Sequence, residues 1–272
     1  MKTRNKVVEM HEMQLSKEEI LTKIEALEVY RAIKSTNPKI KEDIKKLKNE
    51  LISGLSRHDR RGGTWFASVY KKVVETRSKT ITLEVLEAAY NTKDKEFIAG
   101  KLVAHYCNYG ISVGAVLGSA GGLLGLFTAA YVTFEELTCL AYFQLCLMYD
   151  LSVLYGRPIE KVNNLEIYRL LKASFGFKEK ELASKGKKVI EDKLLRGDSQ
   201  RLLYGLLKNL GAAIVRKSVK NLVSKMVPLI GTIIAMLVCT AEDYKAVKTV
   251  AKRSLYFYNN SSDINSLKMP NK

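Results

Sequence analysis

The chain has 272 residues, 47% of them hydrophobic, only four prolines and a formal net charge of +17. This length and apolar content support a buried core and exclude a disordered or fibrous chain, and the scarcity of proline favours long helices. The charge is uneven, because residues 157–272 hold 23 Lys and Arg against 10 Asp and Glu, whereas residues 101–156 hold one against three. Such a field attracts anionic surfaces, either phospholipid headgroups or nucleic acid.

Two charged helices are predicted near the N-terminus. Ser16-Lys-Glu-Glu19 has the form of a capping box and begins the first, and Pro38 begins the second. Their apolar stripes are narrow, so residues 1–55 are expected to form an outer layer on a helical domain that spans residues 64–258. Met1–Gln14 contains no apolar segment, so no secretory signal is predicted and the expected location is the cytoplasm.

The next helices are predicted from the residues that begin them. Trp65 follows a loop and starts one helix, Thr82 is placed to cap another, and Asp94 precedes a third that leads into a glycine-rich stretch. No segment alternates apolar and polar residues as a half-buried strand does. The sequence therefore predicts an all-α fold.

The stretch Leu102–Phe134 carries no permanent charge. Within it the glycines recur mostly at every fourth position, and they are Gly110, Gly114, Gly118, Gly121, Gly122 and Gly125. On a helix this spacing forms a stripe without side-chain bulk, along which another backbone comes close. Each glycine costs about 1 kcal/mol of helix propensity against alanine, so packing or lipid must offset the cost.

A second apolar segment, Leu137–Tyr155, follows Glu135 and Glu136 and is ended by Gly156. We expect residues 110–156 to form an apolar helical hairpin that turns near the two glutamates and lies at the centre of a multi-helix bundle. Each arm approaches the ~20 residues that a membrane span requires. Packing of the glycine face against the second arm would keep the protein soluble, and lipid in place of that packing would insert it.

The C-terminal part is predicted to present a basic surface. Eleven basic and three acidic residues lie between Lys185 and Lys225. The charge-free run that follows, Met226–Ala241, is predicted to enter the core. Tyr244–Tyr258 is predicted to be a basic helix, followed by a frayed tail at residues 259–272. The surface candidates are Lys185, Lys187, Lys188, Arg216, Lys217, Lys220, Lys245, Lys248, Lys252 and Arg253. They indicate a solvated face, attraction to anionic lipid, or salt-sensitive nucleic-acid binding without specificity. No recognised nucleic-acid module is present.

Three motifs resemble the EcsC family of bacterial proteins, named after a component of a transporter-linked operon. They are Gly118-Ser-Ala-Gly-Gly-Leu-Leu-Gly125, Gln144-Leu-Cys-Leu-Met-Tyr-Asp-Leu-Ser-Val-Leu-Tyr-Gly156 and Met226-Val-Pro-Leu-Ile-Gly231. Two departures are Thr138, where the family's acidic-Leu-Pro sequence has proline, and Arg157 after Tyr-Gly. The resemblance implies a helical, membrane-associated or envelope-linked protein with no established enzymatic activity and no catalytic residues to transfer.

No catalytic, cofactor or metal site is predicted. His11, His58 and His105 are far apart and lack helix-spaced ligand partners, His105 is expected to be a core histidine, and the four cysteines are expected to be reduced, buried thiols. The polar candidates are Glu135, Glu136 and Asp150. Either the glutamates are solvated at a turn and Asp150 ends a helix, or a buried acid pairs with a lysine of the basic half or titrates when a partner binds.

These patterns predict a non-enzymatic, amphitropic protein at the cytoplasmic membrane face, which binds anionic lipid or a membrane-bound partner through basic helices. Two alternatives stay open. One is an integral-membrane accessory subunit of a transporter or secretion system, and the other is a lipid-acting enzyme with its pocket at the hairpin. The sequence does not indicate the partner or the oligomeric state.

Overall fold

A computed structural model of the chain describes residues 38–53, 55, 56, 59, 62–118, 126–177, 199–224 and 232–260. All regular elements in this part of the chain are helical, which confirms the all-α class and the multi-helix bundle. The elements are α2 (Pro38–Ile52), α4 (Thr64–Arg77), α5 (Leu83–Tyr90), α6 (Lys95–Val113), the π-helical turn η1 (Gly114–Gly118), α8 (Leu126–Leu154), the 3-10 turn η2 (Ile159–Lys161), α9 (Asn164–Phe175), α12 (Ser199–Ser224) and α13 (Thr232–Asn259).

Local capping residues set several helix ends. The Thr82 side chain accepts a hydrogen bond from the Val85 N–H, and the Asp94 carboxylate accepts from the N–H groups of Glu96 and Phe97. These bonds satisfy backbone donors that the first helical turn leaves free, so both predicted helix starts are confirmed.

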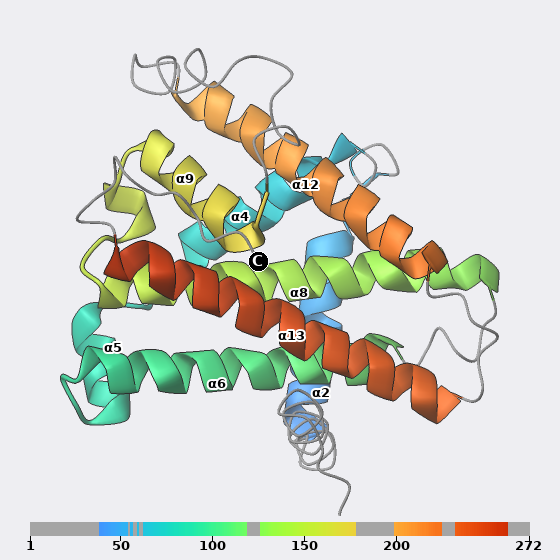
Figure 1. The fold of residues 1–272 in the computed structure, drawn as a ribbon, viewed down its shortest axis with the longest axis horizontal. Helices are drawn as coiled ribbons and strands as arrows, with labels where there is room; N and C mark the ends of the chain where they lie inside the picture. The colour runs from blue at the N-terminus through green and yellow to red at the C-terminus, as the bar shows by residue number, and fades with distance from the viewer. Residues whose placement is uncertain are drawn as a thin grey trace, which may run out of the picture.

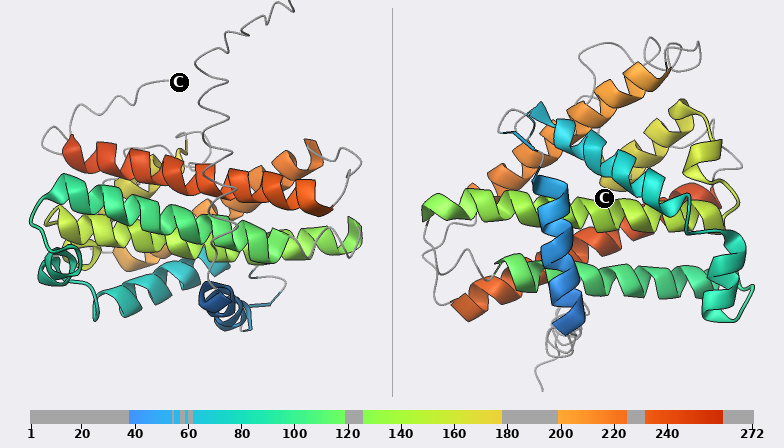
Figure 2. Two further views of the ribbon diagram at one scale, coloured as in Figure 1. Left: turned by 90° about the horizontal axis from the view of Figure 1, so that it is seen from below. Right: turned by 180° about the vertical axis from the view of Figure 1, so that it is seen from behind.

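Helix α8 is the central helix of the bundle (Figure 1). Its residues from Leu145 to Met148 are at most 1% exposed, so it is covered on all sides. Figure 2 shows three layers, with α13 on one side of the α6 and α8 layer and α2 and α4 on the other. Cys139 and Cys146 of α8 and Cys107 of α6 are buried and form no disulfide, as the sequence predicts. The side chain of Cys239 is not among those that the structure describes.

One helix in the described part of the chain is long and apolar enough to cross a membrane. It is the stretch Phe134–Leu154, with a mean hydropathy of 1.5, and 89% of it is buried inside the protein. Helices α4, α6 and α13 pack directly against α8. Protein therefore surrounds this apolar segment in the conformation described here.

The prediction that the hairpin turns near Glu135 and Glu136 is wrong. Helix α8 begins at Leu126 and runs through both glutamates without interruption, so they lie more than two helical turns inside it. Helices α6 and α8 run in opposite directions, so the reversal of the chain precedes α8 (Figure 1). The glutamates do not need solvent at a turn, because side chains from other helices contact them, as described below.

At the start of the glycine stripe, the Cα atoms of Gly110 and Gly114 face α13. A Cβ atom on Gly114 would lie 2.7 Å from the Cα of Thr240, and one on Gly110 would lie 2.9 Å from the Cγ2 of Val247. Real Cβ atoms do not approach so closely, so glycine permits this contact. Gly118 ends the π-helical turn, whereas Gly121, Gly122 and Gly125 lie outside the described residues.

Helix α2 shares the core of the later helices. Ile44 is fully buried, and Leu51 and Ile52 join it in one hydrophobic cluster with residues of α4, α6, α8 and α13. The second predicted N-terminal helix is therefore a packed part of the bundle. The helix predicted from Ser16 and the tail after Asn260 lie outside the described residues.

Two glycine-to-alanine changes on the same run of helix should have opposite effects. Gly114→Ala should destabilise the protein by ~1–3 kcal/mol, because the new methyl group meets backbone atoms of Thr240 that no rotamer change can move. Gly100→Ala should stabilise it by up to ~1 kcal/mol, because Gly100 is exposed and a Cβ there meets nothing within 4 Å. Urea unfolding followed by fluorescence of the single tryptophan, the fully buried Trp65, measures both. Equal stability of the two variants would contradict the close contact with α13.

Candidate functional site

Asp150 lies in a buried polar cluster that joins three helices. Its carboxylate accepts a 2.6 Å hydrogen bond from the Tyr106 hydroxyl of α6, and its Oδ1 lies 3.6 Å from the Arg77 Nε of α4. Arg77 also donates a hydrogen bond to the Tyr106 hydroxyl. Asp150 is 3% exposed, so the cluster is a tie within the core.

The balance of burial and pairing sets the charge of Asp150. Burial raises the pKa of its carboxyl to about 6, and the Arg77 guanidinium and the Tyr106 hydrogen bond oppose that rise. The carboxylate is therefore ionised at neutral pH and has a cationic partner. That partner comes from α4, so the prediction that a buried acid pairs with a lysine of the C-terminal basic half is wrong for Asp150.

Glu135 pairs with a lysine from the N-terminal part of the chain. Its Oε2 lies 3.0 Å from the Lys48 Nζ of α2, and the glutamate side chain is 11% exposed. This ion pair ties α2 to α8 on the side that faces away from α13 (Figure 2). The pair explains how a charged residue, Glu135, is tolerated in the middle of the largely apolar helix α8.

Glu136 meets a second carboxyl group, that of Asp243 on α13. The two side chains share a hydrogen bond, and Asp243 is 7% exposed. Burial raises the pKa of Glu136 to about 7, and burial together with the charge of Glu136 raises the pKa of Asp243 well above its ordinary value. The pair therefore carries a proton at neutral pH.

Asp243, Arg77 and Tyr106 were not predicted from the sequence. Asp243 lies in step with Thr240 and Val247 on the face of α13 that packs on α6, and this helical spacing was the available signal. Nothing local marks Arg77 or Tyr106, because their partner is 44 or more residues away in the chain.

The basic surface candidates divide into three groups. Lys245, Lys248 and Lys252 are exposed along one side of α13, and Arg216 is exposed on α12. The guanidinium of Arg253 lies against Gly176 at the end of α9 and is partly buried, so Arg253 is not part of the exposed row. The remaining candidates lie outside the residues or side chains described, and they are Lys185, Lys187, Lys188, Lys217 and Lys220.

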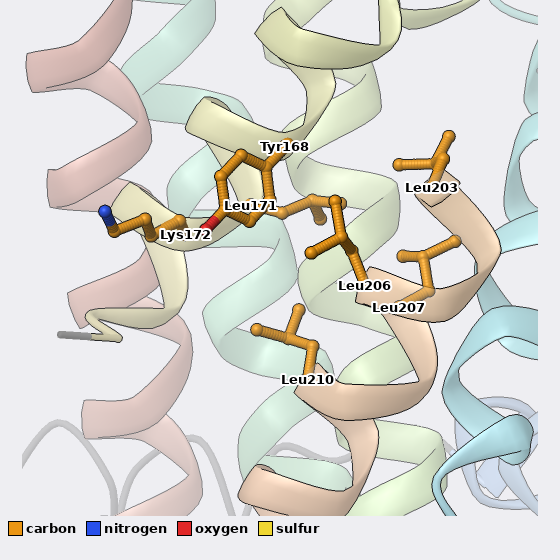
Figure 3. A pocket seen from close by; sticks show the side chains of 7 residues that line it. All are labelled: Tyr168, Leu171, Lys172, Leu203, Leu206, Leu207 and Leu210. Atoms are coloured by element: carbon orange, nitrogen blue, oxygen red, sulfur yellow. The ribbon is translucent and has the colours of Figure 1, made fainter. Parts of the chain in front are cut away.

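A small apolar groove lies between α9 and α12 (Figure 3). Its lining residues are Tyr168, Leu171, Lys172, Leu203, Leu206, Leu207 and Leu210. The groove has room for about one water molecule, so it is not a pocket for a lipid or another substrate in this conformation.

The described side chains contain no group of three His, Cys, Asp or Glu that could hold a metal ion. His105 is exposed and contacts the rings of Tyr106 and Tyr109, so the expectation of a core histidine is wrong. The imidazole projects outward because the adjacent Tyr106 takes the inward position on α6.

No family model, no curated protein and no solved structure matches this chain.

Loss of the Asp150 carboxylate should lower the free energy of unfolding more than loss of an exposed carboxylate. Asp150→Asn should destabilise the protein by ~3–5 kcal/mol, because it leaves the Arg77 guanidinium partly buried without its carboxylate. Glu50→Gln removes the 2.9 Å partner of Lys72 in a well-exposed pair and should change stability by less than ~1 kcal/mol. Both are measured by urea unfolding at pH 7.5. A cost for Asp150→Asn as small as that of Glu50→Gln would show that the cluster does not hold the bundle together.

Proposed function

We propose that this chain is a non-enzymatic, peripheral membrane protein of the EcsC type that binds anionic lipid. The observation that carries the proposal is the row of exposed lysines on α13. Lys245, Lys248 and Lys252 follow one another at three and four residues, which places them on one side of the helix. Helix α13 forms an outer layer of the bundle, so this side is available to a flat surface (Figure 2).

The residues beside the row suit a membrane interface. The Lys248 amine lies 5.0 Å from the centre of the Tyr244 ring, and Tyr256 continues the same side and is 36% exposed. Tyrosine is amphipathic and common where an apolar interior meets water. Each lysine near an anionic surface contributes ~1 kcal/mol, an attraction that salt screens.

The burial of α8 favours the peripheral arrangement over an inserted one. The stretch Phe134–Leu154 is 89% buried inside the protein, and the described start of the glycine stripe packs on α13. Insertion would require both contacts to be exchanged for lipid. The proposal therefore assigns membrane contact to the charged outer face of α13 and leaves the apolar helix in the core.

The test is co-sedimentation with vesicles of neutral phosphatidylcholine, with and without phosphatidylglycerol. The variant Lys245→Gln/Lys248→Gln/Lys252→Gln should bind the anionic vesicles at least about tenfold more weakly at low salt, because three attractions of ~1 kcal/mol are removed. The matched control is Lys45→Gln/Lys71→Gln/Lys79→Gln, which removes three exposed lysines on or next to α2 and α4, across α8 from α13. The control should bind as the wild type does.

Equal losses in the two variants would mean that only net charge matters and would overturn the assignment to α13. Bound protein should leave the vesicles in high salt. Protein that resists an alkaline carbonate wash would instead indicate insertion, and no binding to any vesicle would reject the membrane proposal.

A further inference from the structure

Two carboxyl groups from different helices face each other inside the bundle, at the point where α13 packs most closely on its neighbours. We propose that the Glu136–Asp243 pair is a proton-dependent contact that holds α13 against α8 and the glycine stripe, and that loss of its proton loosens α13.

The burial of the Asp243 carboxyl favours a proton shared between Glu136 and Asp243. Asp243 Oδ2 is buried, has no hydrogen-bond donor and lies 3.2 Å from where a Cβ on Gly114 would be. Thr240 and Val247, one turn away on either side, are fully buried against the same stripe. The carboxylate therefore cannot turn toward water without moving α13.

Among the residues that the structure describes, no cation acts on the pair to compensate a second negative charge. On α13 the charge of Glu242, also an acid, acts on Asp243, and on α8 the neighbouring titratable groups include Cys139 and Glu135. Lys48 of α2 acts on the neighbouring Cys139 and is engaged with Glu135. The adjoining turn, Gly114–Gly118, contains no titratable residue. A fully ionised pair would thus place two like charges together in a region of low polarity.

The sign of the pH effect follows from this arrangement. The ordinary pKa of Glu136 is 4.5 and its pKa in the folded protein is about 7, so the stabilising effect of the proton is full below pH 4.5 and is lost as the pH rises toward 7. Burial and the charge of Glu136 also raise the pKa of Asp243 well above its ordinary value, so its titration adds to the loss as the pH rises. The protein should therefore be held most tightly in mild acid and loosen at and above neutral pH.

The experiment compares the pH dependence of unfolding in the wild type and in Glu136→Gln/Asp243→Asn, which keeps the shape of the pair and removes its titration. The equilibrium constant for unfolding of the wild type should rise, relative to the variant, by up to about tenfold per pH unit and per proton between pH 5 and 7. Asp150, whose pKa is also raised, is present in both proteins, so its contribution cancels. The matched control is Glu135→Gln, which should keep the wild-type slope.

Hydrogen exchange adds a readout that requires no variant. After correction for intrinsic rates, the amides of residues 240–247 should exchange at least about tenfold faster at pH 8 than at pH 6, whereas the amides of Leu145–Met148 in α8 should change much less. If the double variant does not fold, Glu136→Gln alone should still show a shallower slope than the wild type. Parallel pH curves for the wild type and the folded variant, or exchange in α13 that does not depend on pH, would overturn the proposal. Neither measurement uses lipid, so it is independent of the proposed membrane binding.

Discussion

The close approach of α13 to α6 is the contact on which the arrangement of the bundle depends. Gly110 and Gly114 leave no room for a side chain between the two backbones, and the chain continues into a π-helical turn at the same point. Because the backbones meet here, Thr240 and Val247 become fully buried and Asp243 is forced into the interior. The same contact places the lysine row of α13 on the outside, since these residues lie on the opposite side of the helix.

The central helix α8 is stabilised by apolar packing but oriented by three acids. Glu135 reaches Lys48 on α2, Glu136 reaches Asp243 on α13, and Asp150 reaches α4 and α6. An apolar helix that is buried all round has no intrinsic rotational preference, whereas each buried charge needs a particular partner. Polar contacts therefore fix which side of α8 faces which neighbour. Two of these acids are held at elevated pKa by burial, which links the packing of the core to pH.

The proposed function assigns different roles to the apolar region and the basic region, either of which, from the sequence alone, could contact a membrane. Other helices bury most of the apolar region, because α8 is enclosed and the described start of the glycine stripe is covered by α13. The basic region is outside, because Lys245, Lys248 and Lys252 are exposed along one side of α13. A surface with these properties suits an anionic lipid bilayer better than a buried partner, because its lysines remain hydrated while they are attracted.

The sequence by itself determined the all-helical class and several helix ends. The caps at Thr82 and Asp94 and the glycine that ends α9 act within a few residues, so local chemistry is sufficient to predict them. Only the tertiary structure decided the partners. The glycine stripe indicates that another backbone comes close but does not indicate which one. The acids of α8 indicate that polar partners are required but do not identify them. Arg77, Lys48 and Asp243 come from three different helices, and their positions follow from the packing of the whole bundle. The turn assigned to Glu135 and Glu136 was wrong for this reason, because charge in an apolar run indicates solvent only when no distant residue neutralises it.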